Sequence, residues 1–322
     1  MIETYVMRGV DGVVTRKSAE VPKLKVKEVL VRITHTGLCG TDLFYIPFGC
    51  ALGHEGIGIV EEVGSAVTLH NVGDRVGGGY LRSSCGSCTY CLTGRDILCH
   101  SRDCYGMASF SNGTFGTYYV GTESYVYPVP ESISSEFAAP LQCAGATVYS
   151  ALKTYYRPGL RVGVLGIGGL GHLAIQFASK MGAETVVFST SPSKEEEARE
   201  FGASEFVVLG QEDQLAKAVD VLLITAHKSP DWNMYTQQSH TPRSKNTNFL
   251  TTLSFQPLFF NCYNIVTNLV ASRATHAEML NFAAAHKIKP VIEEFKLDEA
   301  GVADALGKLK AGKLRYRAVL HV

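Results

Sequence analysis

Alternating apolar positions predict β-strands over the first third of the chain. Val29, Val31 and Ile33 occupy every second position, which is typical of a strand with one buried face. Residues 57–63 form a run rich in β-branched side chains that ends at Gly64. Short strands separated by glycine-containing turns favour a mostly β unit in this part of the chain.

From about residue 160 the pattern changes to strands that alternate with helices. Residues 161–165 are a short apolar strand between glycines, and apolar residues then recur at helical spacing over 170–181. Further apolar runs predict strands over 185–188, 207–209 and 219–225. This alternation predicts an α/β fold with a doubly wound parallel sheet.

Two capping boxes predict where later helices begin. Ser193 with Glu196 matches the first and opens a helix that carries Ala198. Thr275 with Glu278 matches the second. In each box a hydroxyl and a carboxylate three residues apart satisfy the free amides of a first helical turn.

Residues 226–260 have weaker periodicity, because prolines interrupt clusters of serine, threonine and asparagine. In this stretch the pattern predicts one strand, over 249–255. The last part of the chain predicts a strand over 291–295, a helix over 298–311 and a strand over 317–322.

Length and charge narrow the classes of function. The chain has 322 residues, enough for roughly two domains. Its 30 basic and 30 acidic residues balance, which argues against a nucleic-acid reader of the zinc-finger kind, since such proteins need a basic surface. No segment matches a secretory signal or is long and apolar enough to span a bilayer. We therefore expect a cytoplasmic protein with neither nucleic-acid nor membrane partners.

A cysteine quartet has the spacing of a closed metal site. Cys85, Cys88, Cys91 and Cys99 are separated by two, two and seven residues in a loop rich in glycine and serine. Four thiolates close one tetrahedral zinc site and leave no position for a substrate, so the role would be structural. Four free buried cysteines and an iron–sulfur cluster are the alternatives. Cys104 is interpreted as a core residue.

A second set of ligand types is spread along the chain. It consists of Cys39, His54 and Cys143. Two thiolates and one imidazole would leave a fourth zinc position open, which is the condition for catalysis. Each residue taken alone is weak evidence, because a single buried cysteine or histidine is usually a packing residue.

A glycine-rich loop lies between a predicted strand and a predicted helix. Glycines at such a junction let backbone amides and a helix N-terminus approach a pyrophosphate. The predicted cofactor-binding loop consists of Gly166, Ile167, Gly168, Gly169, Leu170 and Gly171.

The end of the next predicted strand favours NADP(H) over NAD(H). NAD-binding loops place a carboxylate about 20 residues after the glycines, whereas this chain has Ser189, Thr190 and Ser191 there, followed by Lys194. Hydroxyls and an ammonium group would bind a 2′-phosphate, and no carboxylate would repel it. The same serines would also cap a helix.

These motifs occur together in a known order. Leu-Cys-Gly-Thr-Asp, Gly-His-Glu, the quartet loop, Cys-Ala-Gly-X-Thr-Val-Tyr and Gly-Ile-Gly-Gly-Leu-Gly-His follow one another along the chain. In this the sequence resembles the zinc-dependent medium-chain alcohol dehydrogenases, and within them the cinnamyl alcohol dehydrogenase branch of NADPH-dependent aldehyde reductases. The resemblance covers nearly the whole chain and is weakest over 226–260. It implies a Rossmann domain plus a mostly β, GroES-like catalytic domain.

The resemblance implies roles for individual residues. Cys39, His54 and Cys143 fall on the catalytic zinc positions, and Glu55 on a carboxylate that can approach the same metal. Asp42 matches the residue whose carboxylate orients His54.

Three further positions concern the substrate and the cofactor. Thr41 matches the hydroxyl that touches the substrate oxygen and passes on its proton. A histidine often continues this relay in the family, but Phe44 stands at its position here, so the proton must go to water, the cofactor ribose or another group. Arg317 matches an arginine that can reach the pyrophosphate. The stretch between Cys39 and His54 is also shorter than we would expect for a member of this family.

We therefore expect an NADP(H)-dependent alcohol dehydrogenase or aldehyde reductase with two zinc ions per chain. The expected catalytic domain covers residues 1–146 and 286–322, and the expected Rossmann domain covers 147–285. The implied substrates are small aldehydes or alcohols, and the implied assembly is a homodimer. The alternatives are reduction of a C=C or iminium bond on the same scaffold, and a non-enzymatic NADPH-binding protein.

Overall fold

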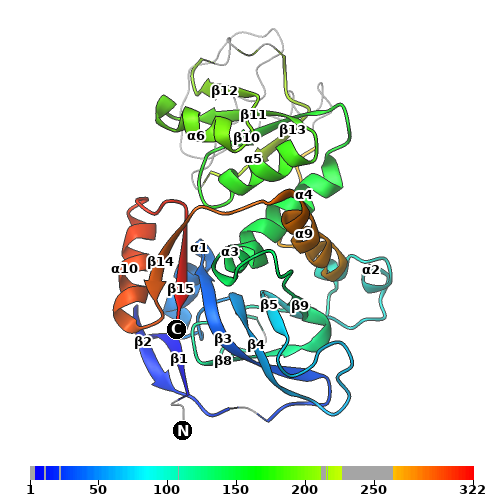
Figure 1. The fold of residues 1–322 in the computed structure, drawn as a ribbon, viewed down its shortest axis with the longest axis vertical. Coiled ribbons are helices and arrows are strands. Elements are labelled where there is room, and N and C mark those ends of the chain that lie inside the picture. The colour runs from blue at the N-terminus through cyan, green and yellow to red at the C-terminus, as the bar shows by residue number, and fades with distance from the viewer. Residues whose placement is uncertain are drawn as a thin grey trace.

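A computed structural model describes residues 4–10, 12–21, 23–107, 109–211, 215, 217–226 and 264–322. The strand predicted over 249–255 lies outside these residues. Two sheets dominate the described fold, one above the other in the view of Figure 1. The predicted α/β class is confirmed.

The lower sheet is mostly antiparallel and has seven described strands. Its main path runs β14–β15–β3–β4–β5–β9, and β8 pairs with β3 off this path. The C-terminal strand β15 therefore lies beside β3, which is far away in the sequence (Figure 1). The strands are β3 (Glu28–Leu38), β4 (Glu55–Val63), β5 (Arg75–Gly79), β8 (Tyr118–Thr122), β9 (Val126–Pro128), β14 (Ile292–Lys296) and β15 (Arg317–His321).

The upper sheet is parallel, as the alternation of strands and helices predicts. Its described strands follow the order β12–β11–β10–β13, and all pairs are parallel. The chain begins with β10 in the middle of the sheet and adds β11 and β12 on one side. It then crosses back to place β13 on the other side of β10. Each strand lies within three residues of its predicted bounds. The strands are β10 (Arg161–Leu165), β11 (Glu184–Ser189), β12 (Glu205–Val208) and β13 (Val221–Ile224).

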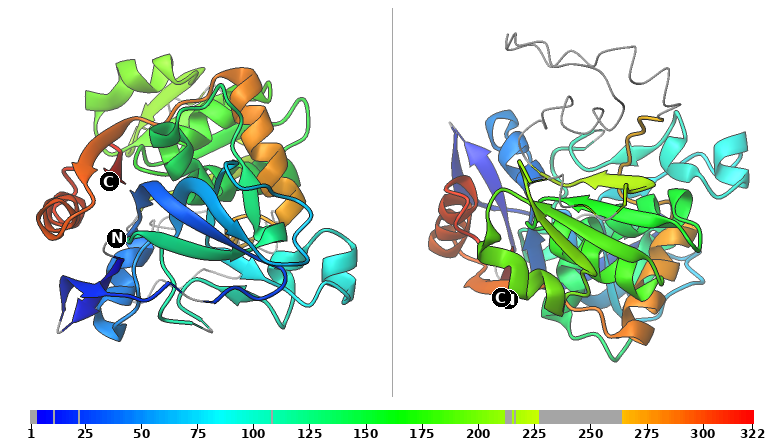
Figure 2. Two further views of the ribbon diagram at one scale, coloured as in Figure 1. Left: turned by 60° about the horizontal axis from the view of Figure 1, so that its bottom comes forward. Right: turned by 90° about the horizontal axis from the view of Figure 1, so that it is seen from above.

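Helices join the two sheets and cover their faces. Figure 1 shows α4 and α9 between the sheets, and the view from above in Figure 2 shows α10 near the β1–β2 hairpin. The helices are α1 (Gly40–Tyr45), α2 (Thr89–Leu92), α3 (Ser135–Pro140), α4 (Ala146–Tyr155), α5 (Gly171–Lys180), α6 (Glu195–Glu200), α9 (Arg273–His286) and α10 (Glu299–Lys310). The remaining strands are β1 (Tyr5–Val10), β2 (Val13–Ser18), β6 (Leu81–Ser83) and β7 (Asp103–Cys104).

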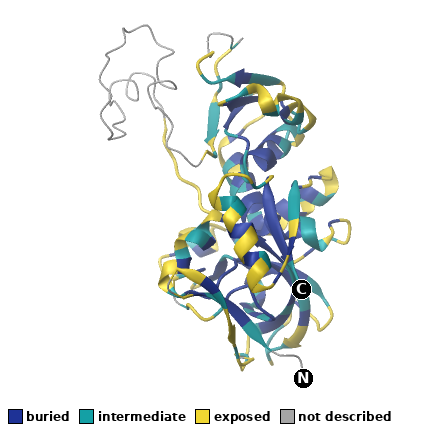
Figure 3. Ribbon diagram, turned by 90° about the vertical axis from the view of Figure 1, so that its left-hand side faces the viewer, coloured by how far each residue is buried: buried dark blue, intermediate teal, exposed yellow. Residues whose placement is uncertain are grey.

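One hydrophobic core continues from the upper sheet into the lower one. Leu152, Phe177 and Met279 come from the three helices α4, α5 and α9, and the same cluster includes Val319 of β15. Figure 3 shows buried residues running through the interior of both parts. Burying each such side chain contributes about 1.5–3 kcal/mol, so this core fixes the relative position of the two sheets. The predicted domain boundaries stay predictions.

Both predicted capping boxes are wrong. Helix α6 begins at Glu195, after a 3₁₀ turn over Pro192–Lys194, and the Ser193 hydroxyl bonds to Ser191 instead (2.9 Å). Helix α9 begins at Arg273, so Thr275 lies inside its first turn.

The cap of α9 comes from a distant part of the chain. The Arg273 amide donates to both carboxylate oxygens of Asp96 (3.3 Å each). A carboxylate from elsewhere in the fold satisfies the free amide as well as a local box does. The local sequence pattern therefore contains no sign of it.

Candidate functional site

Three separate segments bring the predicted catalytic set together. Cys39 follows β3 and opens α1, His54 and Glu55 stand at the start of β4, and Cys143 lies in a π-helical turn (Leu141–Gly145) between α3 and α4. The ligand atoms of these four residues all lie within 4.8 Å of one another, and all four residues are buried. Single-turn π-helical distortions of this kind occur frequently at functional sites.

The electrostatics of His54 fit a metal ligand. Its Nδ1 donates to Asp42 (3.2 Å), while its buried Nε2 has no hydrogen-bond partner among the described residues. Burial lowers the pKa of His54, but the charge and hydrogen bond of Asp42, together with the charge of the nearby Cys39, more than offset this and raise the pKa to about 10. An ion on Nε2 would take the place of that second proton, and the Asp42 bond would fix the ring that holds it.

The two thiols differ in acidity, because their mutual hydrogen bond lowers the pKa of Cys39 and raises the pKa of Cys143. A hydrogen bond from Cys143 lowers the pKa of Cys39 well below its usual range, against the opposing effect of burial. Zinc ligands lie about 2.0–2.3 Å from the ion, so shifts of about an ångström would let this set surround one ion. The donor set of two thiols and one imidazole fits zinc.

Glu55 is held at the edge of the set by Arg317. Burial raises the pKa of Glu55 to about 7, and the guanidinium opposes this rise. Arg317 Nη2 donates to Glu55 Oε1, and the other oxygen, Oε2, is buried without a partner among the described residues. Gly37 makes room for this carboxylate, since a Cβ there would lie 1.9 Å from Oε2.

Arg317 also connects the metal set to the glycine-rich loop. A Cβ on Gly169 would lie 3.0 Å from the Arg317 Cδ, so the two residues are in contact. The Arg317 Nε is buried and has no partner in the described part of the chain. A free N–H beside the loop fits the predicted contact with a pyrophosphate.

The loop itself has the geometry that its glycines predict. Gly166 has a φ of +91°, which L side chains rarely adopt, and Gly171 begins α5. A Cβ on Gly171 would lie 1.9 Å from the Gly166 carbonyl oxygen. The glycines thus allow the tight turn and the close approach of helix to strand. The predicted Ile167 and Leu170 lie within this loop.

The residues predicted to choose the cofactor lie next to the loop. Ser189 ends β11 and is buried, whereas Thr190 is exposed and Ser191 is partly exposed. Lys194 donates one hydrogen bond to the Ile167 carbonyl (2.8 Å). An ammonium group has three donors, so Lys194 can still bind a phosphate oxygen.

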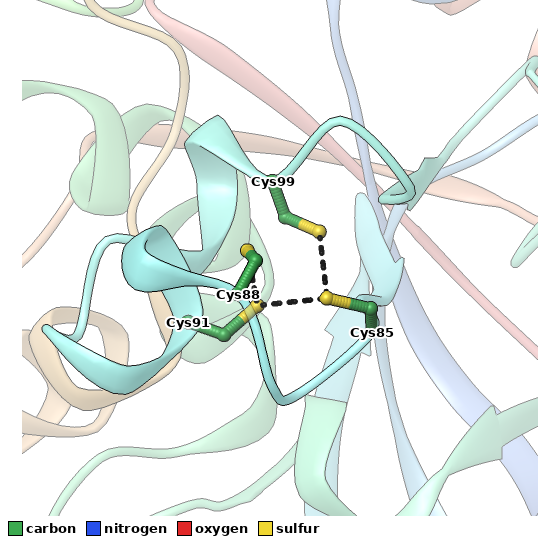
Figure 4. A group of neighbouring side chains, drawn as sticks. All are labelled: Cys85, Cys88, Cys91 and Cys99. Atoms are coloured by element: carbon green, nitrogen blue, oxygen red, sulfur yellow. Dashed lines mark hydrogen bonds between the residues drawn. The ribbon is translucent and has the colours of Figure 1, made fainter.

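The quartet is gathered as predicted (Figure 4). The Sγ···Sγ distances are 3.5 Å for Cys85–Cys99, 3.6 Å for Cys88–Cys91 and 3.9 Å for Cys85–Cys91. Four sulfurs at 2.3 Å from one tetrahedral ion would be about 3.8 Å apart. The quartet therefore fits zinc with little movement. Cys104 lies in a separate buried cluster with Leu81 and Tyr125.

Sequence reasoning missed two residues that support these sites. Tyr105 donates its hydroxyl to Asp42, and His172 joins the glycine-rich loop to Val291. His172 could have been noticed because it ends the glycine motif. Tyr105 has no comparable signal, since its sequence neighbours do not distinguish it from the other tyrosines.

His172 predicts a pH dependence of stability. Its Nδ1 donates to the Gly168 carbonyl (2.9 Å) and its Nε2 accepts from the Val291 amide (3.2 Å), so the ring must be neutral. Burial lowers the pKa of His172 from 6.5 to about 4. Its contribution to stability is therefore complete above pH 6.5 and is lost as the pH falls toward 4. This contribution amounts to about 3 kcal/mol.

Urea unfolding at pH 7.5 and pH 4.5 measures this contribution. We expect His172→Gln to lose less unfolding free energy between the two pH values than the wild type. His100→Gln is the matched control, because His100 is exposed. Equal pH slopes in all three proteins would contradict the prediction.

A parallel sheet with a glycine-rich turn, joined to a mostly β unit with a Cys–His–Cys set, defines a class of dinucleotide-linked dehydrogenases. Residues 25–131 match the family model "Alcohol dehydrogenase GroES-like domain", and residues 169–230 match "Zinc-binding dehydrogenase". An alcohol dehydrogenase of Geobacillus stearothermophilus is 36% identical over 95% of this chain and 95% of its own. The chain belongs to the family of zinc-binding, medium-chain alcohol dehydrogenases.

Solved structures agree with this assignment. A cinnamyl alcohol dehydrogenase of Sorghum bicolor superposes with a TM-score of 0.88 at 29% identity, covering 99% of this chain and 97% of its own. The cinnamyl alcohol dehydrogenase of Helicobacter pylori complexed with NADP(H) gives 0.85 at 26% identity, with 99% and 98% covered. The predicted Rossmann and GroES-like architecture is thereby confirmed. Among the helices described, none has both the length and the apolar character needed to cross a bilayer.

Proposed function

We propose that this protein is a zinc-dependent, NADP(H)-preferring alcohol dehydrogenase that reduces aldehydes or oxidises primary alcohols. The observation that carries the proposal is the convergence of Cys39, His54 and Cys143 in one buried set, in which the His54 Nε2 has no hydrogen-bond partner among the described residues. Glu55 and Arg317 link this set to the glycine-rich loop, so a metal-bound substrate and a dinucleotide would meet at one place. The relative complexed with NADP(H) supports the choice of cofactor.

Each residue near the set has a task in this proposal. Zinc would act as a Lewis acid on the carbonyl or hydroxyl oxygen, and NADPH would supply the hydride. Cys39, Cys143 and the His54 imidazole would hold the metal, and Asp42 keeps that imidazole in its orientation. Thr41, whose Oγ1 lies 3.7 Å from the Cys39 Sγ, would hydrogen-bond the substrate oxygen and transfer its proton.

The proton route beyond Thr41 differs from a histidine relay. Phe44 has no ionisable group, and its side chain is 63% exposed. We propose that Thr41 passes the proton to water or to a cofactor ribose hydroxyl. The same feature favours the second candidate function, reduction of a C=C or iminium bond, because such a reaction does not protonate a carbonyl oxygen.

A substrate panel with NADPH, combined with zinc analysis, tests the proposal. We expect two zinc ions per chain and oxidation of NADPH with aldehydes. Turnover of enals or iminium compounds with no aldehyde turned over would favour the second candidate. A homodimer and a cytoplasmic location also belong to the proposal, and size-exclusion chromatography with light scattering would test the first of these.

Thr190→Asp is expected to shift the cofactor preference toward NADH by at least about tenfold in the ratio of kcat/KM values. The new carboxylate would repel a 2′-phosphate and accept hydrogen bonds from a free ribose. Thr190→Asn introduces a side chain of nearly the same size as aspartate but without the charge, and this variant serves as the control. An unchanged ratio in Thr190→Asp would contradict the assignment of this loop to the 2′-phosphate.

A further inference from the structure

The Asp42 carboxylate gathers hydrogen-bond donors from distant parts of the chain. Its Oδ2 accepts the Cys39 amide (2.9 Å), and its Oδ1 accepts the Gly53 amide (3.1 Å) and the His54 Nδ1 (3.2 Å). The Tyr105 hydroxyl donates to the same Oδ1 (2.9 Å). The carboxylate is completely buried, and a buried charge of this kind depends on its full set of donors.

Tyr105 contacts the histidine in two ways. Its hydroxyl bonds to the carboxylate that orients His54, and its ring stacks on the imidazole, with centroids 4.6 Å apart and planes at 29°. The Gly53 amide also donates to the phenol oxygen (3.2 Å). Burial raises the pKa of Tyr105 far above its usual range, so the phenol remains a donor.

The surroundings hold Tyr105 in this position. Its amide donates to the Tyr80 carbonyl (2.7 Å), and its ring meets the Tyr45 ring edge-on at 5.0 Å. The Arg82 guanidinium lies 5.4 Å from the ring centroid. Gly106 permits this packing, because a Cβ there would lie 2.2 Å from the Tyr45 ring. The fully buried phenol is thus restrained from several directions.

We propose that Tyr105 is a positioning residue for the Cys39–His54–Cys143 metal set, acting through Asp42. It completes the donors of the carboxylate and supports the face of the imidazole, so Nε2 stays aimed at the thiols. The inference rests on the proposed function, because it requires a metal at this set. It predicts that the phenol hydroxyl affects metal retention even though it touches neither substrate nor metal.

Tyr105→Phe tests the inference, because it removes the hydroxyl and keeps the ring. In the zinc-loaded variant exposed to a chromogenic chelator, we expect the zinc of the Cys39–His54–Cys143 set to leave about tenfold more readily than it does in the wild type. The zinc of the quartet should stay in place. In the cobalt(II)-substituted enzyme, the visible absorption of the Cys39–His54–Cys143 set should shift, which a general loss of stability would not cause.

Tyr127→Phe is the matched control. The Tyr127 side chain is buried, and its hydroxyl has no hydrogen-bond partner among the described residues. This variant also removes one buried phenol hydroxyl, but none that bonds to Asp42. We expect its metal retention and cobalt spectrum to match those of the wild type.

A double-mutant cycle with Asp42→Asn tests the route of the effect. If Tyr105 acts through the carboxylate, adding Tyr105→Phe to Asp42→Asn should change metal retention by less than about twofold. Equal losses in the two backgrounds would overturn the proposed route.

The outcomes separate this inference from the proposed function. A wild-type enzyme that binds one zinc would overturn the proposed function and this inference together. Two zinc ions in the wild type, with retention in Tyr105→Phe equal to that in Tyr127→Phe, would overturn the inference alone. A Tyr105→Phe protein that does not fold with a filled quartet would also overturn it, since the hydroxyl would then serve stability.

Discussion

Cys143→Ala is expected to lower kcat/KM for NADPH-linked aldehyde reduction by at least about 1,000-fold without unfolding the protein. The variant removes one of two thiols from the buried set, and a Lewis acid contributes several kcal/mol of transition-state stabilisation, each 1.4 kcal/mol being a factor of ten. The π-helical turn that carries the thiol contributes Leu141 and Ala144 to the extensive core, whereas the thiol itself packs in a small cluster with Cys39 and Val270. Its loss should therefore cost only about 1 kcal/mol of unfolding free energy.

Steady-state rates, zinc content and thermal unfolding measure this effect. We expect about one zinc per chain instead of two. Cys104→Ala is the control, because Cys104 is an equally buried thiol outside both ligand sets (2% exposed, against 7% for Cys143). A Cys143→Ala enzyme with wild-type turnover would exclude the metal set as the catalytic centre.

Cys85→Ser is expected to act on the fold instead of the chemistry. The segment that carries the four cysteines, residues 85–99, has little apolar core of its own, because α2 is only four residues long and Leu92 and Leu98 are exposed. Metal binding must then supply much of its folding free energy, which is on the order of 10 kcal/mol for a structural zinc. We expect a sharply reduced yield of folded protein and a lower melting temperature.

Ser87→Ala, in the same loop, is the control for Cys85→Ser. Zinc release and the yield of folded protein distinguish the two variants. If Cys85→Ser and Cys143→Ala lost the fold to the same extent, the division into a structural and a catalytic metal site would be wrong.

Much of the parallel sheet could be predicted from the sequence. Its strands are short apolar runs, and β10, which lies between Gly159 and Gly166, occupies the predicted residues 161–165. Local signals work best for β10 and β11, which are buried at nearly every position, because a strand buried on both faces needs apolar residues along its whole length. The glycine-rich loop was predictable for a related reason, since a φ of +91° at Gly166 leaves few other residue types.

The helix starts show where such reasoning stops. Ser193 and Thr275 have the expected partners three residues later, yet neither opens an α-helix. Pro192 begins a turn that displaces the first start, and the distant Asp96 supplies the cap of α9. A cap needs only an acceptor at the right place, and sequence spacing does not reveal an acceptor from another segment.

The sequence by itself determined the ligand types, the spacing of the quartet and the position of the glycine-rich turn, because these depend on residue identity over short distances. Only the tertiary structure decided that Arg317 connects Glu55 with Gly169, and that Tyr105 shares the Asp42 carboxylate with His54. Such contacts join segments that are far apart in the chain, and long-range packing of a buried core places them at hydrogen-bond distance. Local periodicity does not contain that information.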